Sequence, residues 1–302
     1  MSGGFAADHG SGSGEVARAF LVELERWTAV DRSASLPALR TGLLGWLRAA
    51  QAAQPSMALI HQLAARALAV VDTGAGRHDS PADLRAALAL SCATERDDLA
   101  RARAGVVRQA LALLSGTGGW IATLSASGAV RDALLEAHRA GRGPRVLVAE
   151  SRPRREGRAL AAALAAAGIP VWLVVDAALP LVLSQARMVW LGADAITERG
   201  VINKVGSFAA ALAAREHSVP VYALAERRKF IAAATGALKI VEMPPAEVWA
   251  TPAPGVEPRN VYFELVPMEL LRGVAVEDAV LPPGEASAVA RERPLPAELS
   301  GA

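Results

Sequence analysis

Cysteine is nearly absent from this sequence, since Cys92 is the only one among 302 residues. A single cysteine excludes an internal disulfide and a thiolate metal site. Its position among alanines and leucines indicates a buried, unreactive thiol. The five histidines are scattered and none has the spacing of an HExxH motif, so we predict no metal site.

Long apolar runs and an excess of one charge are missing as well. No stretch reaches the length of a membrane span without a charged or turn-forming residue. The first fourteen residues, MSGGFAADHGSGSG, lack the apolar centre of a signal peptide. Lys and Arg number 32 against 30 Asp and Glu, a net charge of +2. These patterns predict a cytoplasmic protein with neither a membrane nor a nucleic-acid partner.

The hydrophobic pattern divides the chain into two folded parts. Residues 1–14 are rich in Gly and Ser and are predicted to be a flexible tail. Residues 15–114 carry apolar residues three to four apart, with caps at Ser33 or Ser35 and at Ser80, and helices opening at Pro55 and Pro81. They are predicted to form an all-helical N-terminal domain.

From residue 115 to residue 285 the pattern alternates between short apolar runs and Ala-rich stretches. Strands are expected at residues 120–124, 145–149, 171–175, 188–191, 219–224 and 237–241, and helices at residues 128–140 and 156–167. This alternation predicts an α/β fold with a Rossmann-like parallel sheet. Residues 286–302 are expected to be a C-terminal tail.

Glycine-rich phosphate motifs are incomplete. Residues 115–119, SGTGG, are not followed by Gly-Lys-Ser/Thr and are interpreted as a domain joint. The first predicted strand is not followed by GxGxxG, so the sequence gives no support for dinucleotide binding and predicts no cofactor.

Polar residues follow the predicted strands in succession, and carboxyl ends of parallel strands meet at one edge of a sheet. Each has a purely structural alternative: Ser127 as a helix cap, Arg152 as a surface residue, and Asp194 in a hairpin or loop. A carboxylate, cations and helix N-termini at one crevice suit a small phosphorylated polyol. The candidate residues are Ser125, Ser127, Glu150, Arg152, Asp194, Asn203 and Lys204.

Three of these segments resemble one family: the alpha, beta and delta subunits of translation initiation factor 2B and the related methylthioribose-1-phosphate and ribose-1,5-bisphosphate isomerases. Residues 150–153 with Gly157 look like its E-S/T-R-P-x-x-x-G element. Residues 192–207, GADAITERGVINKVGS, look like GADxI…G…NKxGT, with Ser207 in place of Thr. Residues 260–267 look like its NPYFE/D…P segment, with Val261 in place of Pro.

The resemblance implies a helical domain before a Rossmann-like domain, a homodimer or larger homo-oligomer, and a bound phosphorylated sugar or nucleotide. It also implies that Asp194 and the residue at position 125 are catalytic. Asn203 and Lys204 would contact phosphate and hydroxyl groups, with Arg152, Glu150 and Ser127 as further contacts.

Two departures from the family bear on activity. Isomerase members have a cysteine where this chain has Ser125, and an unactivated serine exchanges protons poorly near neutral pH. The N-terminal half also lacks the arginine of an RGA-like element, for which residues 75–77 are a weak substitute. Three functions therefore stay open: an aldose–ketose isomerase of a phosphorylated pentose, a non-catalytic sensor of a sugar phosphate or nucleotide, and an initiation factor 2B-like assembly subunit.

Overall fold

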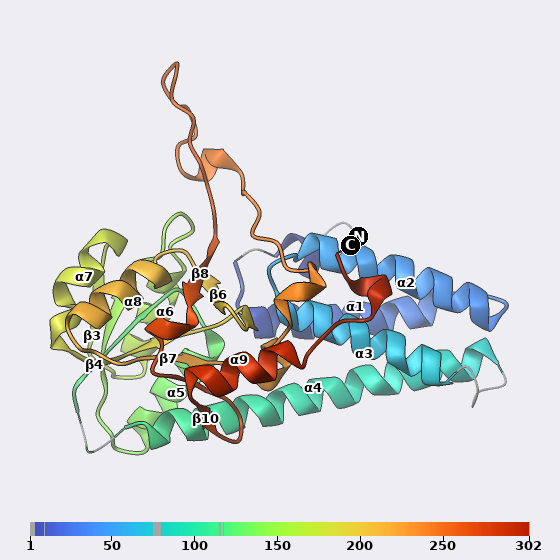
Figure 1. Cartoon of the computed structure of the whole chain (residues 1–302), viewed down its shortest axis with the longest axis horizontal. Helices are drawn as coiled ribbons and strands as arrows, with labels where there is room; N and C mark the ends of the chain where they lie inside the picture. The colour runs from blue at the N-terminus through green and yellow to red at the C-terminus, as the bar shows by residue number, and fades with distance from the viewer. Residues whose placement is uncertain (1–3, 9, 75–79, 115, 117, 302) are drawn as a thin grey trace.

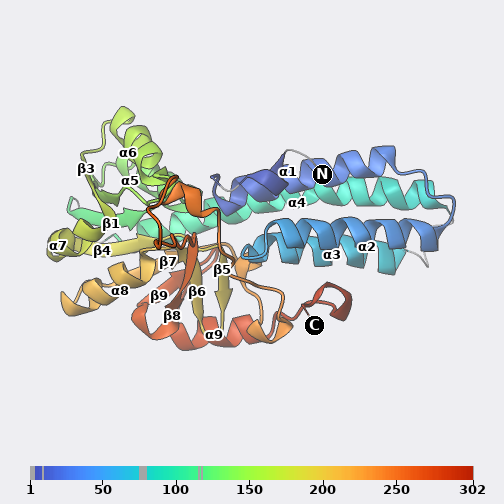
Figure 2. The ribbon, with the colours of Figure 1, turned by 90° about the horizontal axis from the view of Figure 1, so that it is seen from above.

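The computed structural model of the chain describes residues 4–8, 10–74, 80–114, 116 and 118–301. An elongated set of helices is followed by an α/β unit (Figures 1 and 2). The helical part consists of α1 (Ser13–Val30), α2 (Leu36–Ala53), α3 (Ala58–Gly74) and α4 (Pro81–Ala112). None of the helices in the described part of the chain is both long enough and apolar enough to span a membrane.

Capping residues set where helices of the helical part begin, and apolar faces pack these helices together. Ser35 and Ser80 each begin a helix by accepting a hydrogen bond from the backbone N–H three residues on, as the sequence predicts. The third helix begins at Ala58, three residues after the predicted start at Pro55. Apolar residues on facing sides of α1 to α4 form one buried core.

The segment before α1 is packed rather than free. Phe5 is fully buried and contacts Phe20 of α1 edge to face, with ring centroids 5.5 Å apart. Gln54 at the end of α2 donates a hydrogen bond to the Phe5 carbonyl at 2.8 Å. The described residues among 1–14 thus differ from the flexible tail that their composition predicts, because one buried aromatic side chain ties them to the helices.

The α/β unit contains a predominantly parallel sheet, which confirms the predicted fold class. Within the described residues the sheet has seven strands in the order β10-β9-β7-β4-β1-β2-β3, and only β10 is antiparallel to its neighbour. The strands are β1 (Trp120–Leu124), β2 (Arg145–Ala149), β3 (Val171–Val174), β4 (Ala186–Leu191), β7 (Val221–Leu224), β9 (Gly273–Ala275) and β10 (Val280–Leu281).

Helices cover both faces of this sheet. One face packs against α4, α5 (Gly128–Arg139) and α6 (Glu156–Ala166). The other packs against α7 (Leu179–Val182), α8 (Ser207–Glu216) and α9 (Pro283–Arg291). The short 3-10 segments are η1 (Phe5–Ala7), η2 (Asp176–Ala178), η3 (Leu183–Gln185), η4 (Arg227–Lys229), η5 (Ala233–Thr235), η6 (Pro245–Glu247), η7 (Met268–Leu270) and η8 (Ala297–Leu299).

A second, antiparallel sheet was not predicted. It joins β5 (Ala195–Thr197), β6 (Gly200–Lys204) and β8 (Phe263–Pro267). Asn203 and Lys204 therefore end a strand instead of opening a helix, because each pairs with a residue of β8. The helix that follows begins three residues after Lys204, at Ser207.

Two further predictions about the late part of the chain are corrected. Residues 237–241 do not form a strand. They lead into a segment that projects away from the body of the protein (Figure 1, orange). The expected tail from residue 286 begins inside α9, where Ala286 and Ala290 are fully buried against the large sheet. Leu299 is buried in the core of the helical part.

Helix α4 joins the two parts, since it extends under both of them (Figure 1). Its contact with the loop after β9 is close at Gly105. A Cβ at this position would lie 2.5 Å from the carbonyl oxygen of Glu277 and 2.8 Å from its Cα. Both of these atoms belong to the backbone, which cannot move aside as a flexible side chain can. The absence of a side chain at residue 105 therefore allows the helix to lie this close to the loop after β9.

We expect Gly105→Ala to lower the free energy of unfolding by about 1–3 kcal/mol, because the added methyl group forces helix and loop apart. Gly45→Ala is the matched control, since Gly45 lies inside α2 and a methyl group added there would have no other atom within 4 Å. That change should stabilise the protein by up to about 1 kcal/mol through helix propensity. Urea unfolding of both variants checks the prediction, and equal effects would contradict it.

Candidate functional site

The candidate site lies where the order of the large sheet reverses. β1 and β4 are neighbours, but the chain continues from β1 to β2 on one side and from β4 to β7 on the other. Such a reversal opens a crevice at the carboxyl ends of the two strands, and ligands bind there in open α/β sheets. Ser125 directly follows β1 and Asp194 follows β4.

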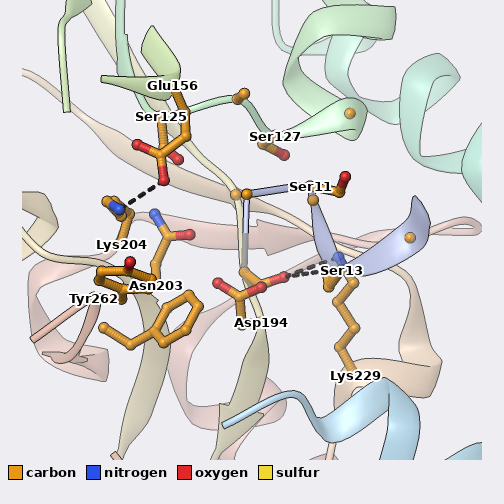
Figure 3. A pocket seen from close by; sticks show the side chains of 18 of the residues that line it. Ser11, Ser13, Ser125, Ser127, Glu156, Asp194, Asn203, Lys204, Lys229 and Tyr262 are labelled. Carbon is orange, nitrogen blue, oxygen red and sulfur yellow. Dashed lines mark hydrogen bonds and ion pairs between the residues drawn. The ribbon is translucent and has the colours of Figure 1, made fainter. Parts of the chain in front are cut away.

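A cavity of about 50 Å³ lies in this crevice. Its walls come from the strand ends and from the N-termini of α1, α5 and α6 (Figure 3). Five predicted residues line it together, namely Asp194, Ser125, Ser127, Asn203 and Lys204.

Asp194 is held firmly at the cavity wall. Its side chain is almost completely buried, and its backbone N–H donates to the Ile202 carbonyl at 2.8 Å. Its carbonyl accepts from the N–H of Ala58 at 3.0 Å, which links it to the start of α3. Burial raises the pKa of the Asp194 carboxyl to about 6, although Lys229, Lys204 and a hydrogen bond from Ser13 act to lower it.

A buried ion network stands beside Asp194. Lys229 donates to the carbonyl oxygen of Ala193 at 2.8 Å and pairs with Glu226 at 3.1 Å. Arg103 of α4 reaches the other oxygen of Glu226 at 2.6 Å, and Asp132 at 3.4 Å. Burial alone would raise the pKa of Glu226, but Lys229 and Arg103 outweigh it and hold the pKa well below its usual range.

Lys204 occupies the opposite wall. Its ammonium group is buried, pairs with Glu156 at 2.7 Å and lies 4.5 Å from the centre of the Tyr262 ring. This arrangement explains how a buried cation is tolerated, since a carboxylate and an aromatic face replace water. Next to it, the Asn203 amide donates to the Ser207 hydroxyl at 2.9 Å.

Two long helices point their N-termini at the cavity. Gly12 begins α1 without a side-chain cap, and Ser127 begins α5 by accepting from the N–H of Val130 at 3.5 Å. Gly14 must be small, because a Cβ there would lie 2.5 Å from the guanidinium of Arg103. The first amides of a helix carry partial positive charge and favour an anion.

The loop after β1 is supported by the loop after β2. Ser125 has a left-handed backbone with a φ of 64°, and its N–H donates to the Ser151 hydroxyl at 2.6 Å. The N–H of Ser151 and that of Arg152 donate in turn to the carboxylate of Asp176, each at 2.7 Å. Asp176, which follows β3, thus orders both loops.

Two predicted residues lie away from the cavity. The carboxylate of Glu150 pairs with Arg158 at 2.6 Å, and the exposed Arg152 reaches the Val248 carbonyl at 3.4 Å. Neither lines the cavity. Residues 75–77, considered as a replacement for the missing phosphate contact, lie outside the described residues.

A match to a protein-family model over most of the chain shows which family it belongs to. The model of the initiation factor 2 subunit family, IF-2B, matches residues 11–283. The chain belongs to this family.

Curated relatives share about a third of their matched residues with this family member. It is 37% identical over 174 residues to a putative translation initiation factor eIF-2B subunit 2-like protein of Pyrococcus furiosus, over 57% of this chain and 61% of that one. It is 35% identical over 175 residues to the ribose 1,5-bisphosphate isomerase of Archaeoglobus fulgidus, over 55% of each chain. The matched part thus spans little more than half the length of these relatives.

Solved structures agree in fold. The translation initiation factor eIF-2B of Pyrococcus horikoshii OT3 has a TM-score of 0.79 at 24% identity, covering 92% of this chain and 94% of that chain. The 5-methylthioribose 1-phosphate isomerase of the same organism has a TM-score of 0.75 at 20% identity, covering 95% and 85%. At these identities the likeness concerns the fold alone.

Several cavity residues of this family member were not predicted from its sequence, namely Ser13, Arg103, Glu156, Lys229 and Tyr262. The Gly-Ser composition of residues 10–14 is typical of disorder, and the charged middle of α4, which contains Arg103, is typical of a solvated face. Lys229 ends the charged run of residues 226–229, which is also typical of a solvated face and gives no signal of burial.

The raised pKa of Asp194 predicts a specific pH dependence of stability. A carboxyl group with a higher pKa in the folded state binds its proton more tightly when folded, so stability falls as the pH rises from about 4 to about 6. We expect Asp194→Asn to exceed the parent in free energy of unfolding by up to about 3 kcal/mol at pH 7. Below pH 4 the difference should vanish.

Urea unfolding of both proteins between pH 4 and pH 7 measures this difference. Asp97→Asn on the exposed side of α4 is the control, and it should change the free energy of unfolding little at any pH. A difference for Asp194→Asn that stays constant over this pH range would contradict the prediction.

Proposed function

We propose that this cavity binds a phosphorylated pentose and that the protein is an aldose–ketose isomerase of the ribose 1,5-bisphosphate or methylthioribose 1-phosphate type. One observation carries the proposal: Asp194, whose carboxyl has a raised pKa of about 6, lines a cavity that also receives the N-termini of α1 and α5. Relatives named as isomerases of both substrates support it, at 35% and 37% identity over about half of this chain.

In this proposal the phosphate is held mainly by backbone amides. The cations around the cavity already have carboxylate partners: Lys204 has Glu156, while Lys229 and Arg103 share Glu226. Helix N-termini are therefore the groups that still lack an anion. Residues 12–14 and the start of α5 would supply these amides, since the N–H groups of Gly10 and Ser11 already donate to the carboxylate of Asp8 at 3.0 and 2.9 Å.

A pentose phosphate needs more room than the cavity provides. About 50 Å³ accommodates a few water molecules, given about 10–15 Å³ for each. Residues 10–14 consist of Gly and Ser alone, so this wall carries no bulky side chain. We expect the cavity to widen there when the sugar enters.

Asp194 is suited to the proton transfers of isomerisation. The reaction moves a hydrogen between C1 and C2 and needs a group that exchanges protons with the adjoining hydroxyls near neutral pH. A carboxyl with a pKa of about 6 meets this need. Ser125 faces the same cavity and donates a hydrogen bond in this proposal, without acting as a base.

We expect ribose 1,5-bisphosphate or methylthioribose 1-phosphate to raise the melting temperature of the full chain. A ligand at about a hundred times its dissociation constant stabilises the folded state by roughly 2.7 kcal/mol. Proton NMR of each stabilising compound then measures conversion to the ketose. Stabilisation without conversion would favour the sensor, and no stabilisation by any sugar phosphate or nucleoside monophosphate would contradict the proposal.

Asp194→Asn should abolish turnover and leave ligand-induced stabilisation nearly unchanged, because the amide keeps the shape of the side chain but cannot transfer the proton. An unchanged turnover rate would exclude Asp194 as the residue that transfers protons.

Ser125→Cys is expected to raise the rate of ketose formation, because a thiol ionises near pH 8.5 and exchanges protons far more readily than a hydroxyl. Ser127→Cys is the matched control, since that residue lines the same cavity but caps α5. A rate that rises equally in both variants, or in neither, would contradict the role given to position 125.

A further inference from the structure

A second cavity lies on the other side of the η4 segment. It is an open groove of about 490 Å³ between α3, α4, η4 and the chain after α9. The feature that its lining shares is arginine, and we call it the arginine groove. Its arginines are Arg66, Arg101, Arg108, Arg227, Arg228 and Arg293.

Most of these arginines have a carboxylate partner. Arg228 pairs with Glu95 at 3.0 Å and with Asp98 at 2.7 Å. Arg227 pairs with Asp278 at 2.8 Å. These pairs join η4 to its neighbours, and by themselves they have a structural explanation.

The remaining charge has no such explanation. Arg66 shares Glu95 with Arg228, and Arg101 shares Asp98 with it. The side chains of Arg108 and Arg293 make no hydrogen bond or ion pair with any residue that the structure describes, although both line the groove. Six guanidinium groups thus face Asp98 and Glu277 as the lining carboxylates, with Glu95 and Asp278 behind them. An excess of positive charge remains.

We propose that the arginine groove binds a small anion that carries two or more phosphate groups. Guanidinium groups match phosphate oxygens in pairs, and several arginines around one concave surface attract a compact polyanion more strongly than a single charge. The volume of the groove lies within the range of small-molecule sites. Phe230 is its aromatic residue and is fully buried, so the groove contacts phosphate and offers no ring for a base to stack on.

The arginine groove is separate from the candidate site, although the two are neighbours. Consecutive residues of η4 face different cavities, with Arg228 lining the groove and Lys229 lining the site. On α4, Arg101 and Arg108 line the groove while Arg103 lines the site. The proposal therefore does not depend on the isomerase activity.

Calorimetric titration of the full chain with tripolyphosphate at fixed ionic strength tests the proposal. The variant is Arg108→Gln with Arg293→Gln, which removes two groove charges and breaks no ion pair. Its matched control is Arg142→Gln with Arg291→Gln, which removes two exposed charges outside the groove and likewise breaks no ion pair among the described residues. We expect the groove variant to weaken binding by about tenfold or more, since each charged hydrogen bond is strong, and the control to change it little.

Three outcomes would overturn the proposal. Equal weakening in both double variants would mean that tripolyphosphate responds to net charge alone. Unchanged binding in the groove variant would place the anion elsewhere. Hexaglutamate that binds as tightly as tripolyphosphate, and loses this affinity in the groove variant, would identify the groove as a site for acidic peptides. Thermal melting should show the groove variant folded, because neither replaced side chain has a partner to lose.

Discussion

The buried ion network around Glu226 is the constraint on which the rest of the candidate site depends. Arg103 comes from the long helix α4, Lys229 from η4, and Glu226 binds both at distances of 2.6 and 3.1 Å. Removing one member of such a network leaves an uncompensated buried charge, which is far more costly than an exposed pair is valuable. The network therefore fixes the helical part of the protein against the end of β7, and Lys229 extends this order to the Ala193 carbonyl after β4, beside Asp194.

Charge balance also explains why Asp194 differs from the buried acid Glu226. Glu226 has two cations within ion-pair distance, so its carboxylate stays ionised. For Asp194, Lys229 and Lys204 contribute charge only from farther away, since each ammonium group is paired elsewhere, and burial prevails. Lys229 and Arg103 thus keep Glu226 charged, whereas Asp194 stays able to exchange a proton near neutral pH. This division suits a site in which one acid is structural and the other acts on a ligand.

Segments from both parts of the chain make up the cavity, which is why its composition escapes simple motif analysis. The start of α1 and the middle of α4 contribute from the helical part, and the strand ends contribute from the α/β unit (Figure 3). Substitutions far apart in the sequence can therefore affect one site. The arginine groove is built in the same way, with η4 as the element that it shares with the cavity.

The sequence by itself determined the fold class, the helical start, most strands of the large sheet and five residues of the cavity. These follow from local periodicity, capping and the rule that parallel strands end at one edge. Only the tertiary structure decided that Glu150 and Arg152 point elsewhere, that Lys204 is paired with Glu156, and that residues 10–14 form a cavity wall. The physical reason is that a side chain's partner depends on which segments meet in space. Arg103 and Glu226 are 123 positions apart, and no local pattern records such a pairing.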